Sequence, residues 1–145
     1  MVAAAHRISR GSDFDRTLKS GVRVTTRDLV IHVLPLNTSP PADPDERPAM
    51  VATVGGPWLG LIVSKAVGNA VTRHRVARRL RAAFARVHDQ FSVPETMMVI
   101  RARPSTAQLG SAELSEQITT ALSRRRIREA FDERLSTSHG SRVRS

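Results

Sequence analysis

The chain has 145 residues, a length that corresponds to one domain with a modest hydrophobic core. Its 23 Lys and Arg residues against 13 Asp and Glu give a formal net charge of +10, which favours nucleic acid or an anionic membrane surface as the partner. The absence of cysteine excludes disulfides and thiolate metal sites, and it agrees most simply with a reducing cytoplasm.

A membrane partner fits the sequence less well than nucleic acid does. No stretch approaches the ~20 apolar residues of a membrane span, and the start, MVAAAHRISR, lacks the apolar run of a signal peptide. Aromatic residues make up only 3%, too few for a membrane-surface helix with an aromatic apolar face. Nearly all the positive charge is arginine, whose planar fork pairs with phosphate and stacks on bases, although a high-GC genome also enriches arginine.

The first predicted element is a short helix over residues 11–21, GSDFDRTLKSG. Ser12 is a plausible N-cap with acidic residues in the first turn, and Gly21 is a plausible end. Phe14 and Leu18 are four positions apart, so they share one face of this helix.

A strand and a long loop follow. Residues 27–35, RDLVIHVLP, are rich in β-forming residues and contain His32. Residues 35–57 hold most of the prolines and several acids, so we expect a solvated loop of variable length, with a short strand at MVATV.

The middle of the chain predicts a strand, a turn and a long helix. Residues 58–64, WLGLIVS, form a near-continuous apolar run, as in a strand that is covered on both faces. The KAVG segment then turns, and Asn69 lies at the N-cap position of a helix that reaches about Phe91. The core stripe of this helix comprises Val76, Leu80, Ala83, Phe84, Val87 and Phe91.

The C-terminal part predicts a strand and two helices. Residues 96–102, TMMVIRA, form the strand, and residues 111–122 form an amphipathic helix. A second apolar stripe follows at Ile127, Phe131 and Leu135. At ~100° per residue this stripe lies on a different face of a continuous helix than Leu114 and Ile118. We therefore expect a break near residues 123–126, then a short helix and a disordered basic tail.

The order of elements is helix, two or three strands, helix, strand, helix. It predicts an α/β fold, an α+β two-layer sandwich with a βαβ unit from Trp58 to Ala102 at its centre. Residues 1–122 should form the domain, with residues 35–57 as its variable loop, and residues 123–145 should add the extra helix and tail.

The helix after residue 69 is strongly basic. Asp and Glu are absent from residues 65–88. A merely solvated face would intersperse both signs, so the pattern indicates a polyanionic partner. On a helical wheel one exposed flank holds Arg75, Arg79 and Arg86, and the other holds His74, Arg78 and Arg81. Arg73 lies on the sheet side near Lys65, where the free N–H groups of the helix N-terminus can bind phosphate.

Catalytic alternatives find little support. A metallonuclease needs clustered carboxylates, but the acids here lie mostly in the loop, the first helix and the C-terminal region. No GxxxxGK[ST] or GxGxxG motif is present, and the five histidines show no metal-binding spacing. His74 alone could act as a general base, but a single histidine on a basic helix is more often a phosphate or base contact.

Residues 64–81, SKAVGNAVTRHRVARRLR, resemble the signature of the protein subunit of bacterial ribonuclease P, approximately S-K-K-x-G-N-A-V-x-R-N-R-x-K-R-x-x-R. The matching residues are Ser64, Lys65, Gly68, Asn69, Ala70, Val71, Arg73, Arg75, Arg78 and Arg81. The segments HRISRGSDF, GV and RARPS agree in order, so the resemblance spans residues 6–122. His74 replaces the usual Asn, and Ala66 and Ala77 replace Lys. The arginine-rich composition fits a high-GC bacterium.

The resemblance implies the fold of the second domain of ribosomal protein S5, with a left-handed βαβ crossover where general rules predict a right-handed one. It implies an endoribonuclease whose catalysis belongs to an RNA subunit, with Mg²⁺ needed for that reaction and no cofactor held tightly by the protein. The implied partners are ribonuclease P RNA and precursor tRNA in the cytoplasm, without a membrane or an obligate protein partner. The implied RNA-binding residues are Lys65, Asn69, Arg73, His74, Arg75, Arg78, Arg79 and Arg81.

The resemblance also implies that the 5′ leader of precursor tRNA lies between the sheet and the first helix, where bases stack on aromatic side chains. Phe14 matches one such position, although core packing would explain it equally well. Leu18 and His32 stand where the family has further aromatics, so stacking is weaker here or is supplied by His32. Two alternatives stay open: a ribosomal or general RNA-binding module without processing activity, and a self-sufficient nuclease.

Overall fold

The computed structural model describes residue 8, residues 11–36 and residues 56–143, with side chains described as far as residue 134. A four-stranded sheet with the order β1-β2-β4-β3 forms its centre. The strands are β1 (Val22–Thr25), β2 (Leu29–Pro35), β3 (Trp58–Ile62) and β4 (Thr96–Ala102). β2 pairs antiparallel with both β1 and β4, whereas β3 runs parallel to β4. β1 and β3 are therefore the two edges of the sheet.

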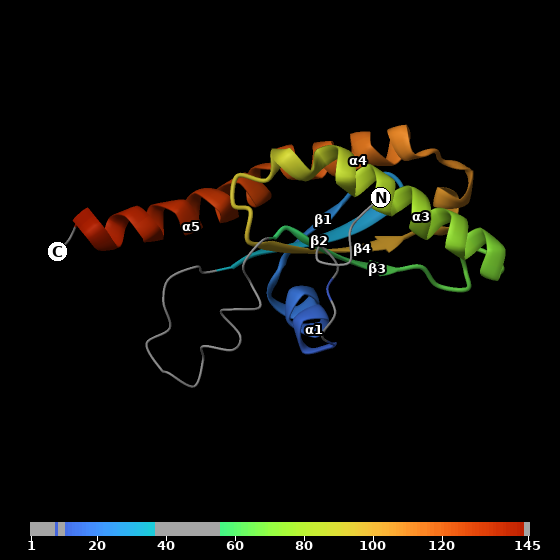
Figure 1. The fold of residues 1–145 in the computed structure, drawn as a ribbon, viewed down its shortest axis with the longest axis horizontal. Helices are drawn as coiled ribbons and strands as arrows, with labels where there is room; N and C mark the ends of the chain where they lie inside the picture. The colour runs from blue at the N-terminus through green and yellow to red at the C-terminus, as the bar shows by residue number, and fades with distance from the viewer. Residues whose placement is uncertain (1–7, 9–10, 37–55, 144–145) are drawn as a thin grey trace.

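Helices cover the two faces of the sheet unequally (Figure 1). The longer helices α3 (Ala70–Val87) and α4 (Ser111–Ser123) pack on one face, which we call the inner face. Helix α1 (Gly11–Ser20) lies against the opposite face, which we call the outer face. Two short 3₁₀ helices, η3 (His88–Gln90) and η4 (Pro104–Gln108), flank β4, and α5 (Arg125–Val143) extends beyond the sheet. Among the described helices, α1 alone thus covers the outer face.

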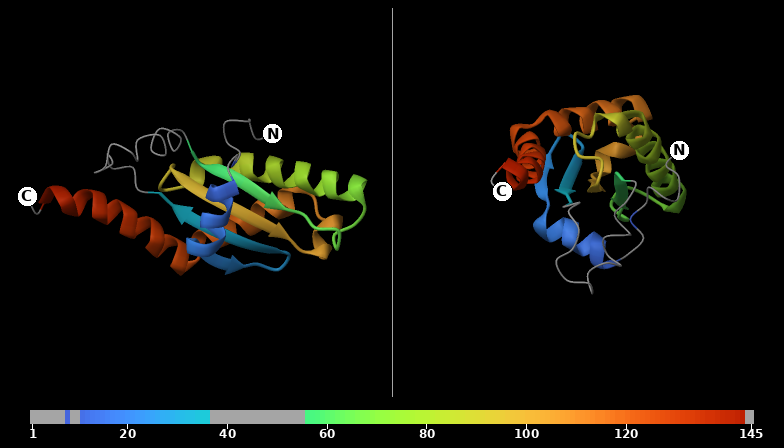
Figure 2. Two further views of the ribbon diagram at one scale, coloured as in Figure 1. Left: turned by 90° about the horizontal axis from the view of Figure 1, so that it is seen from below. Right: turned by 60° about the vertical axis from the view of Figure 1, so that its left-hand side comes forward.

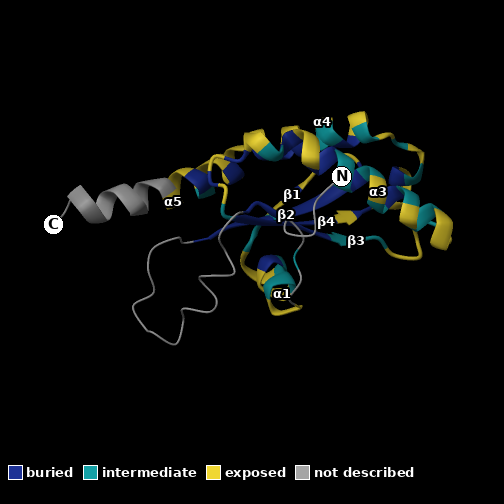
Figure 3. Cartoon of the chain, in the orientation of Figure 1, coloured by how far each residue is buried: buried dark blue, intermediate teal, exposed yellow. Residues whose placement is uncertain are grey.

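The main hydrophobic core lies between the inner face and the helices. Because side chains alternate along a strand, Ile31, Met98 and Ile100 all point inward and are fully buried. The expected stripe of α3 is buried from Val76 to Val87, and Figure 3 shows it facing the buried strands. Two ring contacts, Phe84–Phe91 at 5.7 Å and Phe91–Phe131 at 6.3 Å between centroids, extend this core toward α5.

The connection from β3 through α3 to β4 has the unusual hand that the resemblance implies. β3 and β4 are adjacent and parallel, and α3 is the crossover between them. In the left panel of Figure 2 both strands point right, β4 lies below β3, and α3 lies behind the sheet, which makes the crossover left-handed. The general preference is strongly right-handed, so sequence periodicity could not have predicted this feature.

Three details of the N-terminal half differ from the expectation or extend it. Ser12 is the second residue of α1 and not its N-cap, because the helix already begins at Gly11. β1 had not been identified, because its four residues alternate in burial and carry a weak apolar signal. The strand expected at MVATV lies outside the described residues. The helix does end beside Gly21, whose N–H donates to the Thr17 carbonyl over 2.9 Å.

The break between the last two helices occurs as expected, but the second helix is longer than expected. Arg124 has an extended backbone (φ −63°, ψ 143°), which reorients the chain so that Ile127 and Phe131 are buried in the same core as α4. The helix expected to be short is longer, since α5 continues to Val143, and the last residues of the expected tail, 144–145, lie outside the described residues. No proline follows Pro104, and residues 125–139 contain no glycine, so nothing in that range interrupts a helix.

A polar network ties the β1–β2 turn to α4. The buried Asp28 carboxylate accepts hydrogen bonds from the Ser105 hydroxyl and, over 2.7 Å, from the Gln117 side-chain amide. The side-chain oxygen of Gln117, Oε1, in turn accepts from the Thr26 hydroxyl (2.7 Å) and from the backbone N–H of Asp28 (3.0 Å). Hydrogen bonding from Ser105 is the main cause that lowers the pKa of Asp28 below 3.8, aided by Gln117 and by the positive charges of Arg27 and Arg103. Burial opposes this shift.

Candidate RNA interface

A compact turn sets the direction in which α3 begins. Gly68 has φ +157°, and a Cβ there would lie 2.8 Å from Thr72 Cγ2, so the turn requires glycine. The next residue, Asn69, is the N-cap, and its side-chain oxygen accepts from the Thr72 N–H over 2.9 Å. The Gly68 N–H donates to the Lys65 carbonyl (3.2 Å). Lys65 and Asn69 are therefore both exposed at the positive end of the helix.

One flank of α3 lines a cavity of about 270 Å³ at the β3 edge of the sheet. Its lining residues are Leu61, Val63, Ala70, Arg73, His74, Ala77 and Arg81. Arg73 is half-buried, and its Nε has no hydrogen-bond partner among the described residues. The cavity thus combines apolar side chains with basic ones, and the basic side chains can neutralise phosphates.

The other flank of α3 faces η4 and α4. Arg79 donates from Nη1 to the Leu109 carbonyl over 3.0 Å, so this hydrogen bond joins α3 to the segment between η4 and α4. Arg75 lies on the same flank, and its Nε is buried with no partner in the described part of the chain. Arg78 is exposed. The structure therefore places the expected RNA-binding residues on both flanks of the helix and gives Arg79 a structural contact in addition.

An apolar side chain accompanies these charges. Val71, in the first turn of α3, is 72% exposed and is the one large hydrophobic residue with high exposure among the described residues. Val71 belongs to the motif of residues 64–81, but no site role was predicted for it from the sequence. Its position outside the buried stripe of α3 was the available signal, because a valine there has no core to enter.

The outer face of the sheet carries a second polar group. Strand register aligns Arg23, His32, Val99 and Gly60 in one row across all four strands. Burial, followed by the positive charges of Arg23 and Arg101, lowers the pKa of His32 below 6.5. The His32 Nδ1 atom is buried and has no hydrogen-bond partner among the described residues. The imidazole therefore stays neutral near pH 7 with a ring nitrogen ready to bond to a ligand.

Phe14 lies directly on this face. A Cβ at Gly60 would approach Phe14 Cε2 to 2.6 Å, so the absence of a side chain at Gly60 lets the ring lie against β3. Ile8 donates from its N–H to the Leu59 carbonyl over 2.9 Å and packs beside the same ring position. Phe14 and Leu18 are both half-buried on α1. The structure thus brings Phe14 and His32 to one face, with Leu18 on the same helix as Phe14.

Three residues of this face escaped the sequence analysis. Arg23 and Arg101 point outward beside His32, and Trp58 lies in a small outer cluster with Leu34, Leu36 and Met97. Period-two alternation along β4 would have placed Arg101 on the face opposite Ile100. Arg23 could not have been placed, because β1 itself was not identified.

Comparison with known proteins decides the family. The family model for ribonuclease P matches residues 2–126. The chain belongs to the ribonuclease P protein family. The ribonuclease P protein component of Rhodococcus erythropolis is 45% identical over 124 residues, covering 86% of this chain and 91% of that protein. The component of Corynebacterium diphtheriae is 38% identical over 122 residues, covering 84% and 94%. Both organisms are high-GC actinobacteria, as the composition suggested.

Solved ribonuclease P proteins share the fold. The Staphylococcus aureus protein has a TM-score of 0.60 and 25% identity, with 87% of this chain and 97% of that one covered. The Thermotoga maritima protein also has a TM-score of 0.60, with 80% and 94% covered, and its 18% identity supports the fold alone. These findings confirm the predicted family, the α/β fold and the role of ribonuclease P protein subunit, and they do not favour a general RNA-binding module.

The described residues contain neither a metal-binding cluster nor a membrane-spanning helix. No group of three or more His, Cys, Asp or Glu side chains there is placed to hold a metal ion. No helix in the same part of the chain is long and apolar enough to cross a lipid bilayer.

Proposed function

We propose that this ribonuclease P protein binds the catalytic RNA through α3 and its preceding turn, and holds the 5′ leader of precursor tRNA on the outer face. The observation that carries the proposal is the separation of two different surfaces. One is a basic helix at the β3 edge, and the other is a sheet face with an aromatic ring, a neutral imidazole and flanking arginines.

The α3 surface suits a folded RNA. Lys65, Arg73 and the N-terminal N–H groups of α3 can contact phosphates at the turn, while Arg75 and Arg78 extend the contacts along the helix. Phosphate contacts of this kind fix the orientation of the protein on RNA without reading its sequence. His74 lies on the same surface and can donate or accept one hydrogen bond.

The outer face suits a single strand. A base can stack on Phe14 whatever its identity, and Arg23 and Arg101 can pair with the phosphates on either side of His32. Leu18 supplies apolar contact but no aromatic face, so Phe14 would carry most of the stacking. This arrangement tolerates the varied leader sequences that a general tRNA-processing enzyme meets.

In this proposal the protein positions RNA and performs no bond-breaking step. Mg²⁺ would serve the hydrolysis within the RNA subunit, and the protein would hold no cofactor of its own. The reaction would take place in the cytoplasm, in agreement with a chain that has no cysteine.

The purified chain should be assayed on precursor tRNA with and without ribonuclease P RNA. We expect no cleavage by the chain alone, and at low Mg²⁺ we expect accurate removal of the leader to be faster with the RNA and the chain together than with the RNA alone. Cleavage by the chain alone would contradict the proposal and would favour a self-sufficient nuclease. Equal processing by the RNA with and without the chain would also contradict it.

A further inference from the structure

Helix α5 begins with a concentration of positive charge that the proposed function does not use. Arg124, Arg125 and Arg126 are consecutive and all exposed, and we call them the α5 arginines. The first turn of α5 contains no acidic residue. Arg125 and Arg126 lie in the first turn of α5, where positive charge opposes the helix dipole, whereas Arg124 is the C-cap of α4, where the dipole favours a cation. The family model ends at residue 126, so most of α5 lies beyond the matched region.

The α5 arginines lie at the open edge of β1. Nη1 of Arg126 donates to the Arg23 carbonyl over 3.4 Å, a long contact that places its guanidinium beside the backbone of β1. Ile127 is fully buried in the core and holds this turn in place. Figure 2 shows α5 along the β1 side of the sheet, whereas α3 lies at the β3 side. The α5 arginines and the α3 surface are therefore at opposite edges.

Arg23 joins the α5 arginines to the outer face. Its side chain points outward next to His32, while its carbonyl accepts from Arg126. A row of positive groups thus runs from Arg101 on β4, past His32 on β2, to Arg23 on β1 and on to the α5 arginines. Arg101 lies two residues along β4 from Val99, the partner of His32, so the row runs diagonally across the strands. Adjacent strands lie about 4.8 Å apart, so the row crosses about 10 Å of the sheet perpendicular to the strands.

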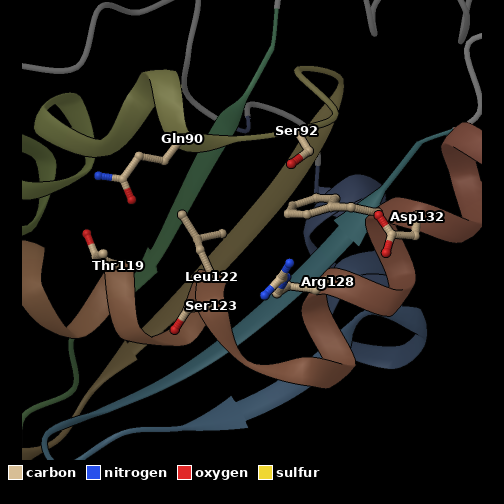
Figure 4. Close-up of a pocket in the computed structure, with 8 residues that line it drawn as sticks. Gln90, Ser92, Thr119, Leu122, Ser123, Arg128 and Asp132 are labelled. Atoms are coloured by element: carbon tan, nitrogen blue, oxygen red, sulfur yellow. The ribbon is translucent and has the colours of Figure 1, made fainter.

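The ion pair with Glu129 does not cancel the charge of this row. Arg125 pairs with Glu129 over 2.8 Å, but the two side chains are 90% and 61% exposed, so the pair is weak and readily exchanged for a phosphate. Arg128 lies on the opposite side of the helix from Arg126, two positions before it. It enters a pocket together with Ser92, Leu122 and Ser123, as Figure 4 shows, so it is not part of the row.

We propose that the α5 arginines bind the phosphates of the distal part of the 5′ leader, after that strand has crossed the outer face and passed over β1. The inference rests on the proposed leader-binding role of the outer face. A single-stranded RNA is the occupant that fits, because the row is narrow, has one sign of charge and continues the surface on which the proximal leader would lie.

The test uses the holoenzyme reconstituted from the full chain and ribonuclease P RNA. Affinity is measured for mature tRNA, for precursor tRNA with a leader of about 4 nucleotides, and for one with a leader of about 12 nucleotides, lengths within the range that single-strand-binding surfaces hold. The variant carries Arg124→Gln, Arg125→Gln and Arg126→Gln, which keep helix propensity and remove charge. Arg134→Gln, an exposed charge further along α5, is the matched control.

We expect the triple variant to bind the long-leader substrate about tenfold more weakly, the equivalent of one charged contact, and to bind the other two RNAs as the wild type does. The control should match the wild type on all three. Equal weakening on all three RNAs would overturn the inference and assign the α5 arginines to the RNA subunit or the tRNA body. Unchanged binding of the long leader would also overturn it.

A failure of the proposed leader-binding role of the outer face would give a different result. In that case the wild-type holoenzyme would bind mature tRNA and both precursors equally. If the triple variant does not fold, Arg126→Gln alone should still lower the salt dependence of long-leader binding by roughly 0.7 in the log–log slope, with no change for the short leader. An unchanged slope for the single variant would overturn the inference.

Discussion

Gly68 decides how the chain enters α3, because no other residue accepts its backbone angle and its contact with Thr72. We predict that Gly68→Ala lowers the free energy of unfolding by more than ~1 kcal/mol and weakens binding to ribonuclease P RNA, since Lys65 and Asn69 would both shift. Gly11→Ala is the control, because a Cβ there meets nothing within 4 Å and Gly11 lies in α1, away from this turn. Urea denaturation and RNA titration of both variants give the comparison. Equal effects of the two substitutions would contradict this account of the turn.

His32 reports on the charges of the outer face. Burial is the first cause of its lowered pKa, and Arg23 and Arg101 add to it, so Arg101→Gln should raise the pKa toward 6.5. Because the pKa of His32 is lower in the folded protein than in the unfolded chain, the unfolded chain binds a proton first as the pH falls. The folded protein therefore becomes less stable as the pH falls from 6.5 through the lowered pKa of the folded state. His32→Gln should therefore flatten the pH dependence of stability in that window.

An NMR titration of the His32 ring measures the first effect, and urea denaturation at several pH values measures the second. Arg134→Gln provides the control for a change in total charge. A His32 pKa that is identical in the wild type and in Arg101→Gln would show that Arg101 does not face the imidazole.

Among the elements, the β1–β2 hairpin depends on Asp28 for its attachment to α4. We predict that Asp28→Asn destabilises the fold by about 1–3 kcal/mol near pH 7, because a buried carboxylate with several hydrogen-bond donors is lost. The Asp28 carboxylate stabilises the fold fully above pH 3.8. This stabilisation disappears as the pH falls through the lowered pKa that Asp28 has in the folded protein. Wild type and variant should therefore converge in acid.

Urea denaturation from pH 7 to about pH 3 tests this, with the exposed Asp15→Asn as the control. A difference between wild type and Asp28→Asn that stays constant over the whole range would mean that the charge of Asp28 plays no part.

The elements differed in how well they could be predicted. Long periodic segments were predicted well, since the α3 stripe from Val76 to Val87 is buried as expected. The α4–α5 break was predicted from the incompatible directions of Ile118 and Ile127. β1 was missed, because an edge strand of four residues gains its stability from pairing with β2 and not from its own pattern. The same difference applies to the candidate site. The α3 residues could be predicted because they are close in sequence, whereas Arg23 and His32 become neighbours only through the pairing of β1 with β2.

At the scale of the whole molecule, positive charge is distributed over both edges of the sheet and over the outer face between them. Affinity for RNA should therefore be mainly ionic. We predict that the observed affinity for ribonuclease P RNA falls steeply with salt, and that Arg78→Gln reduces the log–log slope by roughly 0.7–0.9, the value of one phosphate contact. Arg134→Gln should leave the slope unchanged. Affinity that hardly varies between low and moderate salt would contradict the assignment of α3.

The division of labour between α3 and the outer face is tested most directly by the ratio of precursor to mature tRNA affinity in the reconstituted holoenzyme. Phe14→Leu keeps apolar volume but removes the stacking surface, so it should weaken precursor binding by roughly 1–3 kcal/mol and leave mature tRNA binding unchanged. Arg78→Gln should weaken assembly with the RNA subunit and, once the holoenzyme is saturated, leave the ratio as in the wild type. An equal loss for both tRNAs in Phe14→Leu, or a changed ratio in Arg78→Gln, would contradict the account.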